Sequence, residues 1–433
     1  MKFFLDRRKR TLLLFLILSV FCSGCEQKGK EESKEEQWEQ QEISAGENGE
    51  EEISRKETAK KEISEAEQWA KGYDLPVEAG KENEVEQECL IVVDRISDIY
   101  RYGNKGEGSN IILSDETLER MQEEIGKLGY PVATSEEYCA MVNYEKMDQF
   151  LQECIDGKKC SAVLYDLSSS GGISRKEYTF DGSEMYLLSA GVGWDNSYNP
   201  IVSYVSYTRI DEWSYTEKGW FCYKLCVPEP PEVSEIVDGS ELIRVIPLSE
   251  ECKVLSEKCV YPLCYMENNI LCSNWDTENL RTIDYNAAYE YFYNMKYGER
   301  LDPDKYTNGI PAAEFEDVIM KYLPVTAEEI REWAVYDEET QTYAWANLGC
   351  GNYTLSYLGT ALPEVVDVRE NEDGTTTLTV DAVCEMFIAD DAMITHELTV
   401  DFKEDGSFRY LGNKISDNEI QNIPEYRYRI SRR

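Results

Sequence analysis

Histidine is almost missing from this sequence, because His396 is the only one among 433 residues. A metal site with several histidine ligands is therefore excluded, and any Ser-His-Asp arrangement would depend on this single residue. His396 alternates with Ile394 and Leu398 in a segment that we expect to be a strand. No motif places a nucleophile beside it, so we interpret His396 as a structural residue rather than a general base or pH sensor.

Basic residues are also scarce, with 44 Lys and Arg against 85 Asp and Glu, and the formal net charge is -41. Nucleic acids and anionic lipid headgroups are bound by clustered Lys and Arg. This balance excludes a nucleic-acid partner. It is typical of a soluble surface; capture of cationic partners or divalent ions is the alternative.

Motifs that carry known chemistry are absent as well. The sequence has no Gly-x-Ser-x-Gly elbow, Ser-x-x-Lys set, P-loop, His-Glu-x-x-His or dinucleotide loop. Asp302, Asp304 and Asn308 do not keep the spacing of a calcium-binding EF-hand loop. We therefore predict no catalytic residue, no metal site and no cofactor. Two carboxylates could still meet and act in hydrolysis, but the sequence does not show which two.

The first 25 residues have the pattern of an export signal. A basic head, which ends at Arg10, precedes an apolar run over 12–21 that is shorter than the ~20 residues of a membrane-spanning helix. The run ends at Ser23-Gly24-Cys25, which resembles the lipobox of bacterial lipoproteins and departs from it at Cys22. The resemblance implies a signal peptide over 1–24 and acylation of Cys25, which would anchor the protein to the extracytoplasmic face of the cell membrane. An ordinary thiol after a conventional cleavage site is the alternative.

Residues 25–82 are rich in Glu, Gln, Lys, Ser and Gly and poor in apolar residues. Such a composition does not support a core, so we predict a disordered acidic linker that tethers the folded part to the membrane. The sequence holds 14 cysteines, and twelve remain after Cys22 is cleaved off and Cys25 is acylated. Several fall at core positions of predicted helices or strands, which favours free thiols. One or two disulfides are the alternative.

The remaining chain predicts an α+β fold, because helical periodicity gives way twice to the two-residue period of strands. The expected parts are an N-terminal α+β domain over 83–231, a connecting segment with short strands over 232–282, a C-terminal α+β domain over 283–415 and a loose polar tail over 416–433. Helices on a curved antiparallel meander would suit the cones of the nuclear-transport-factor-2-like superfamily.

Two pairs of residues have the spacing of a helix-starting capping box. They are Thr134 with Glu137, and Thr326 with Glu329. Each pair predicts the start of a helix.

Three stretches between 240 and 415 resemble uncharacterised lipoproteins of anaerobic Gram-positive bacteria. They are 241–248, Asn274-Trp275-Asp276 and 322–326. That family implies no activity. We therefore expect a non-catalytic binding or envelope-assembly protein with a glycan, peptide or envelope-protein partner. A hydrolase of cell-wall glycan or peptide is the alternative. The 30 Tyr and 8 Trp fit half-buried sheet faces or an aromatic binding groove.

Overall fold

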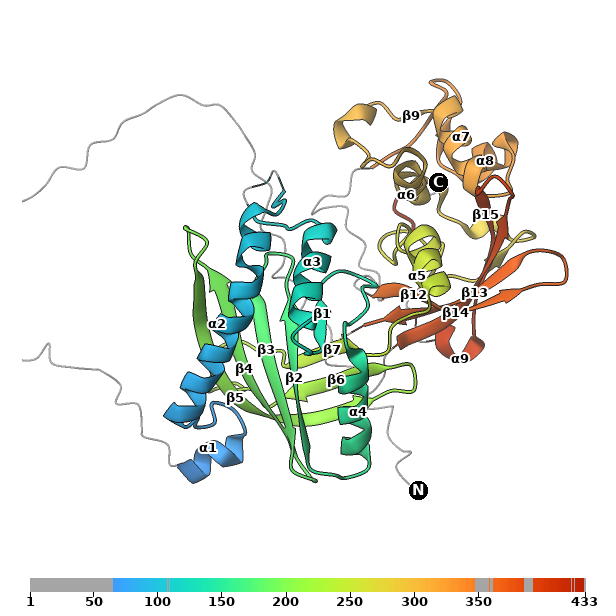
Figure 1. Ribbon diagram of the computed structural model, residues 1–433. Helices are drawn as coiled ribbons and strands as arrows, with labels where there is room; N and C mark the ends of the chain where they lie inside the picture. The colour runs from blue at the N-terminus through green and yellow to red at the C-terminus, as the bar shows by residue number, and fades with distance from the viewer. Residues whose placement is uncertain are drawn as a thin grey trace, which may run out of the picture. The chain divides into compact units, whose positions relative to one another are not determined.

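The computed structural model describes residues 65–431 apart from 107, 109, 347–357, 359–360, 385–391, 422 and 424. The described residues belong to one compact unit. The mixed helices and antiparallel sheets confirm the predicted α+β class (Figure 1). The signal segment, Cys25 and residues 26–64 lie outside the described residues.

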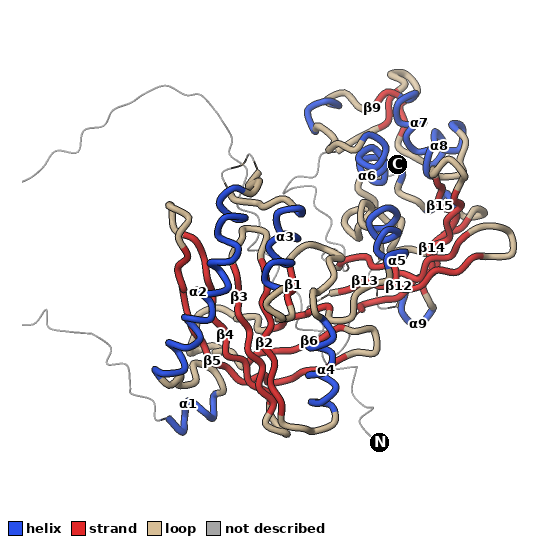
Figure 2. The backbone as a smooth tube through the Cα atoms, in the orientation of Figure 1, coloured by secondary structure: helices blue, strands red, loops and turns tan. Residues whose placement is uncertain are grey.

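The first half of the unit is a seven-stranded sheet whose strand order follows the chain from β1 to β7. All neighbours are antiparallel except β1 and β2, which are parallel. The helices α2 and α3 lie in front of this sheet in the view of Figure 2. The strands are β1 (Val132–Thr134), β2 (Cys160–Leu167), β3 (Ile173–Phe180), β4 (Met185–Trp194), β5 (Pro200–Tyr215), β6 (Trp220–Leu225) and β7 (Ser240–Arg244). The helices are α1 (Glu65–Lys71), α2 (Ala79–Tyr102), α3 (Asp115–Gly126) and α4 (Tyr144–Ile155).

The two faces of this sheet are covered by different helices. Successive residues of a strand point to opposite faces. In β2, Tyr165 and Leu167 pack with α2 and α3, whereas Leu164 packs with Met147 and Leu151 of α4. The helices α2 and α3 therefore cover the outer face, and α4 covers part of the inner face.

The sheet curls strongly around its inner face. Lys176 on β3 forms an ion pair with Glu241 on β7, and the hydroxyl oxygens of Tyr178 on β3 and Tyr223 on β6 are 3.2 Å apart. In a flat sheet β3 and β7 would be ~19 Å apart, because each step between strands is ~4.8 Å. Two side chains do not span that distance. The register of β5 shifts twice, between Gly191 and Val192 in its pairing with β4 and between Ile210 and Glu212 in its pairing with β6. Such bulges add local twist to this long strand.

The second half contains a five-stranded sheet with the order β12-β13-β14-β15-β8 and a short sheet with the order β10-β11-β9. Their strands are β8 (Trp275–Asp276), β9 (Ile310–Pro311), β10 (Tyr336–Asp337), β11 (Thr342–Tyr343), β12 (Leu362–Glu370), β13 (Thr376–Val383), β14 (Ala392–Phe402) and β15 (Phe408–Ile415). The helices are α5 (Glu250–Leu255), the π-helical turn η1 (Ser256–Val260), the 3₁₀ turns η2 (Leu280–Thr282) and η3 (Pro303–Tyr306), α6 (Tyr285–Tyr297), α7 (Ala312–Tyr322), α8 (Ala327–Trp333) and α9 (Asp417–Ile420).

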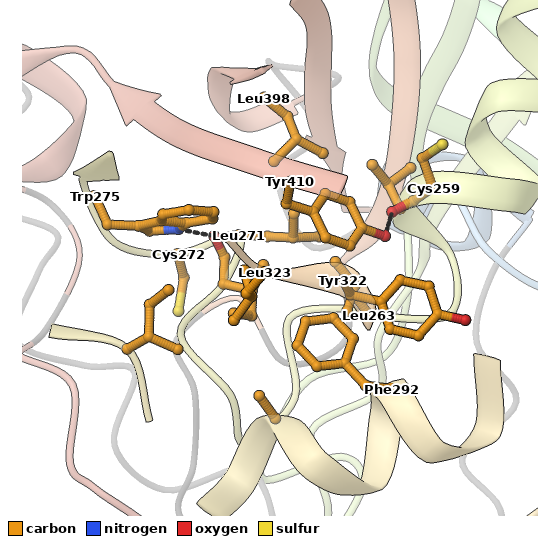
Figure 3. Close-up of a cluster of buried hydrophobic side chains, with 14 of the residues drawn as sticks. Cys259, Leu263, Leu271, Cys272, Trp275, Phe292, Tyr322, Leu323, Leu398 and Tyr410 are labelled. Atoms are coloured by element: carbon orange, nitrogen blue, oxygen red, sulfur yellow. Dashed lines mark hydrogen bonds between the residues drawn. The ribbon is translucent and has the colours of Figure 1, made fainter. Parts of the chain in front are cut away.

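An aromatic core holds this half together (Figure 3). Phe292 stacks on Tyr322 with ring centroids 5.1 Å apart. Tyr410 is fully buried, and its hydroxyl donates to the carbonyl oxygen of Cys259 at 2.6 Å. The indole of Trp275 likewise donates to a backbone carbonyl, that of Ile270, at 2.8 Å. These bonds matter because a buried polar group without a partner destabilises the fold.

The outer side of β6 contacts the second half. Trp220 and Cys222 pack against Val383. Lys218 pairs with the buried carboxylate of Asp381 at 2.6 Å. Hydrophobic contact and a paired buried charge thus join the two sheets.

Three expectations about chain ends and helix starts were wrong. The last part of the predicted linker is folded: Trp69 of α1 packs edge-on against Tyr207, with centroids 6.1 Å apart, and Leu75 is buried. The tail is docked rather than loose, because the Tyr426 hydroxyl donates to Asp284. Thr134 ends the strand β1 instead of starting a helix.

The other capping box is confirmed. The side chain of Thr326 accepts from the backbone N–H of Glu329, and the side chain of Glu329 accepts from that of Thr326, at the start of α8. The predicted connecting segment of 232–282 contributes β7 to the first sheet and β8 to the second.

Candidate binding site

A pocket of about 410 Å³ lies on the inner face of the first sheet. Its position follows from the register. Lys176, Ser189 and Ser206 are directly opposite one another on β3, β4 and β5, so their side chains share one face. The lining residues are Asp166, Ser174, Lys176, Leu187, Ser189, Tyr204, Ser206, Thr208, Leu225 and Glu241.

Lys176 is the charged centre of this pocket. Its side chain is only 8% exposed, and its ammonium donates to the carboxylates of Asp166, at 2.9 Å, and of Glu241. The second oxygen of Glu241 accepts from the Tyr223 hydroxyl. The Tyr223 oxygen can then accept from Tyr178. One lysine is thus held in place by strands from both ends of the curled sheet.

The surroundings of Lys176 favour its charged form. Burial alone would lower the pKa of Lys176, but Tyr178 and the carboxylates of Asp166 and Glu241 outweigh it and raise that pKa. Burial also raises the pKa of Tyr178 and of Tyr223. At neutral pH the ammonium is therefore a fixed hydrogen-bond donor, and both tyrosines stay protonated. The lysine and two carboxylates together carry a formal charge of about -1.

The rest of the polar lining consists of hydroxyl groups. Ser174, Ser189, Ser206 and Thr208 are each half-buried. Within the part of the chain that the structure describes, none of these four side chains makes a hydrogen bond to another residue. A hydroxyl can both donate and accept. The pocket therefore offers several uncommitted donors and acceptors around one fixed positive charge.

His396 does not line this pocket, and its surroundings are those of a buried structural residue. It lies on β14, is 1% exposed, and its Nδ1 is 2.6 Å from the amide oxygen of Asn413. The side-chain amide nitrogen of Asn413 donates to the carbonyl oxygens of Leu271 and Ser273. The amide oxygen of Asn413 therefore faces the imidazole and accepts from Nδ1, which carries the proton. Nε2, 2.8 Å from the Tyr265 hydroxyl, accepts from it. Burial lowers the pKa of His396 to about 4, against the raising effect of the Asn413 bond. This neutral, satisfied imidazole fits the structural interpretation.

The described cysteines form no disulfide with one another, as their core positions favoured. Cys154 at the end of α4 and Cys160 at the start of β2 have Sγ atoms 3.5 Å apart. Burial raises the pKa of both thiols.

The described residues contain neither a metal-binding cluster nor a membrane-spanning helix. No cluster of three or more His, Cys, Asp or Glu that could hold a metal ion occurs among them. No helix in that part of the chain is long and apolar enough to span a membrane.

The sequence did not single out Lys176, Asp166 or Glu241. One signal was present: a lysine in the middle of an alternating strand is unusual on a buried face. Its partner Glu241 lies 65 positions further along the chain, and only the curl of the sheet brings the two together.

These features define an α+β protein with a hydroxyl-lined pocket on the inner face of a curled sheet. The chain belongs to a family of unknown function (DUF6070), whose model matches residues 82–429. No curated protein and no solved structure matches it.

Proposed function

We propose that this protein is a non-catalytic binding protein, held at the outer face of the cell membrane by a lipid on Cys25, and that it takes a small polar ligand into the inner-face pocket. The observation that carries the proposal is the set of four uncommitted hydroxyls around Lys176. Ligand pockets of ~300–1,000 Å³ with a few fixed polar groups are typical of small-molecule sites.

The chemistry of the pocket supports binding over catalysis. Asp166 and Glu241 are both engaged by Lys176, and Glu241 also accepts from Tyr223. A catalytic site usually pairs a nucleophile with a general base or acid. Among the described residues no Cys or His lines this pocket, and both of its carboxylates form ion pairs with Lys176. His396, the only imidazole of the sequence, is buried in the second half.

Membrane attachment rests on the sequence alone. The apolar run and the Ser23-Gly24-Cys25 ending support lipidation of the mature N-terminus. A binding pocket displayed outside the membrane would capture a solute or an exposed polymer end at the envelope.

A thermal-shift screen of small polar compounds tests the pocket. A ligand at 100 times its Kd stabilises a protein by ~2.7 kcal/mol, which shifts the melting temperature measurably. The variant Ser206→Leu fills the pocket and should abolish the shift. Ser161→Leu, on the exposed part of β2, is the matched control and should keep it.

Mass spectrometry of the recovered compound then separates binding from turnover. Intact ligand supports the proposal. A cleaved compound, or a thermal shift that persists in Ser206→Leu, contradicts it.

A further inference from the structure

A second hollow of about 300 Å³ adjoins the inner-face pocket. The two hollows share Asp166, Ser174 and Tyr204. Ser135, Ser168 and Ser203 add hydroxyls to the lining of the second one. The inner face therefore offers two adjoining hollows that together are longer than one pocket, with Ile173 and Val192 as apolar parts of the second.

Tyr204 lies where the two hollows meet. It is directly opposite Gly191 on the neighbouring strand, and a Cβ added to Gly191 would stand only 2.2 Å from its ring. The ring therefore leans across the glycine, and no side chain could replace that hydrogen without moving it. An aromatic ring over a strand glycine is a known stabilising pair in sheets.

The ring is nevertheless available to a ligand. Tyr204 remains 48% exposed, and within the described chain no other aromatic ring stacks on it. Single exposed aromatic residues are common on protein surfaces. Tyr204 differs from them in its place, because its exposed ring borders both hollows and a ligand that occupied them would cover it.

We propose that the ligand is an uncharged carbohydrate of two or more units, and that Tyr204 is the platform on which one pyranose ring stacks. This inference rests on the proposed function and specifies its ligand. The face of a pyranose ring presents C–H groups that pack on an aromatic ring, while its equatorial hydroxyls point outward. Those hydroxyls would meet the serines, the Lys176 ammonium and the Asp166 carboxylate on either side of the ring.

The charges and the lining favour a neutral sugar over other polymers. The formal charge of about -1 around Lys176 opposes acidic sugars and nucleotides. A peptide is recognised through an open strand edge or apolar side-chain pockets. This site lies on the face of the sheet, and hydroxyl and charged groups make up most of the lining of its first hollow.

Titration calorimetry of the full chain with neutral oligosaccharides tests the inference, with gluco-, xylo- and N-acetylglucosamine oligomers as probes. Tyr204→Ala should weaken binding by roughly 10-fold, the upper range of an aromatic contact. Tyr204→Phe keeps the ring and should bind nearly as well. Tyr102→Ala, which removes an 80% exposed tyrosine at the end of α2, is the matched control and should have no effect.

Gly191→Ala gives a second, independent arm. The new methyl group would push the ring aside, so binding should weaken in Gly191→Ala, and combining it with Tyr204→Ala should add no further loss. Melting curves check that each variant folds.

The outcomes separate the two proposals. Binding of an oligosaccharide that Tyr204→Ala leaves unchanged overturns the stacking platform. A non-carbohydrate ligand that Ser206→Leu blocks overturns the carbohydrate inference and leaves the binding function standing. If no probe of either kind binds the unmodified chain, both proposals fail.

Discussion

His396 should contribute to destabilisation by acid, and its contribution should be lost as the pH falls from 6.5 towards 4. The unfolded imidazole has a pKa of 6.5, whereas burial lowers the folded value to about 4. In that window the unfolded state binds more protons than the folded state, so the free energy of unfolding falls as the pH falls. The contribution is fully present above pH 6.5. Between pH 7 and pH 5 the two values give a loss of about 2 kcal/mol.

The hydrogen bonds of the imidazole explain why protonation of His396 is unfavourable in the folded state. Nδ1–H already donates to Asn413, and Nε2 is occupied by the Tyr265 hydroxyl. A proton on Nε2 would bury a charge and leave the Tyr265 hydroxyl proton without its acceptor. No carboxylate bonds to either ring nitrogen among the described residues, so the charge would stay uncompensated.

Denaturant unfolding followed by tryptophan fluorescence at pH 5 to 7.5 measures the effect. His396→Gln lacks the titrating group, and the background from carboxyl groups cancels in the comparison with the unmodified protein. At pH 7 the variant should be about 1–2 kcal/mol less stable, through packing and a lost hydrogen bond. By pH 5 the difference should have vanished. An equal slope in both proteins would refute the assignment to His396.

Three shorter predictions concern other sites. Mild oxidation should join Cys154 to Cys160, whose Sγ atoms are 3.5 Å apart, with a loss of two hydrogens by mass spectrometry; Cys154→Ser should prevent it, and no cross-link in the unmodified chain would contradict the pairing. Arg429→Ala should cost about 3 kcal/mol in denaturant unfolding, because the side chain of Arg429 is 1% exposed and pairs with Glu290 at 2.9 Å; unchanged stability would mean that the tail is not docked. Cys25→Ala should release the protein from membranes into the soluble fraction, and a variant that still pelleted after a salt wash would rule out the lipid anchor.

The sequence by itself determined the α+β class, because helical periodicity gives way to the two-residue period of strands and side chains on one face of an element repeat with the period of its backbone. The capping box at Thr326 is local, so its residues alone decide it. The Thr134 pair has the same spacing and fails, because Val132–Thr134 pairs with β2 instead. Tertiary pairing overrode the local signal there.

Only the tertiary structure decided which residues meet. Trp69 and Tyr426 fall in stretches too polar to predict order, and they are held by Tyr207 and Asp284 from distant parts of the chain. The composition of a segment shows how much apolar surface it can bury by itself. It does not show which contacts a distant segment will make with it. The pocket shows this most clearly. In the sequence Lys176 is an isolated charge within a strand, and only the curl of the sheet brings Glu241 of β7 to it across the inner face. Curl is set by twist and bulges summed over several strands, so no short stretch of sequence specifies it.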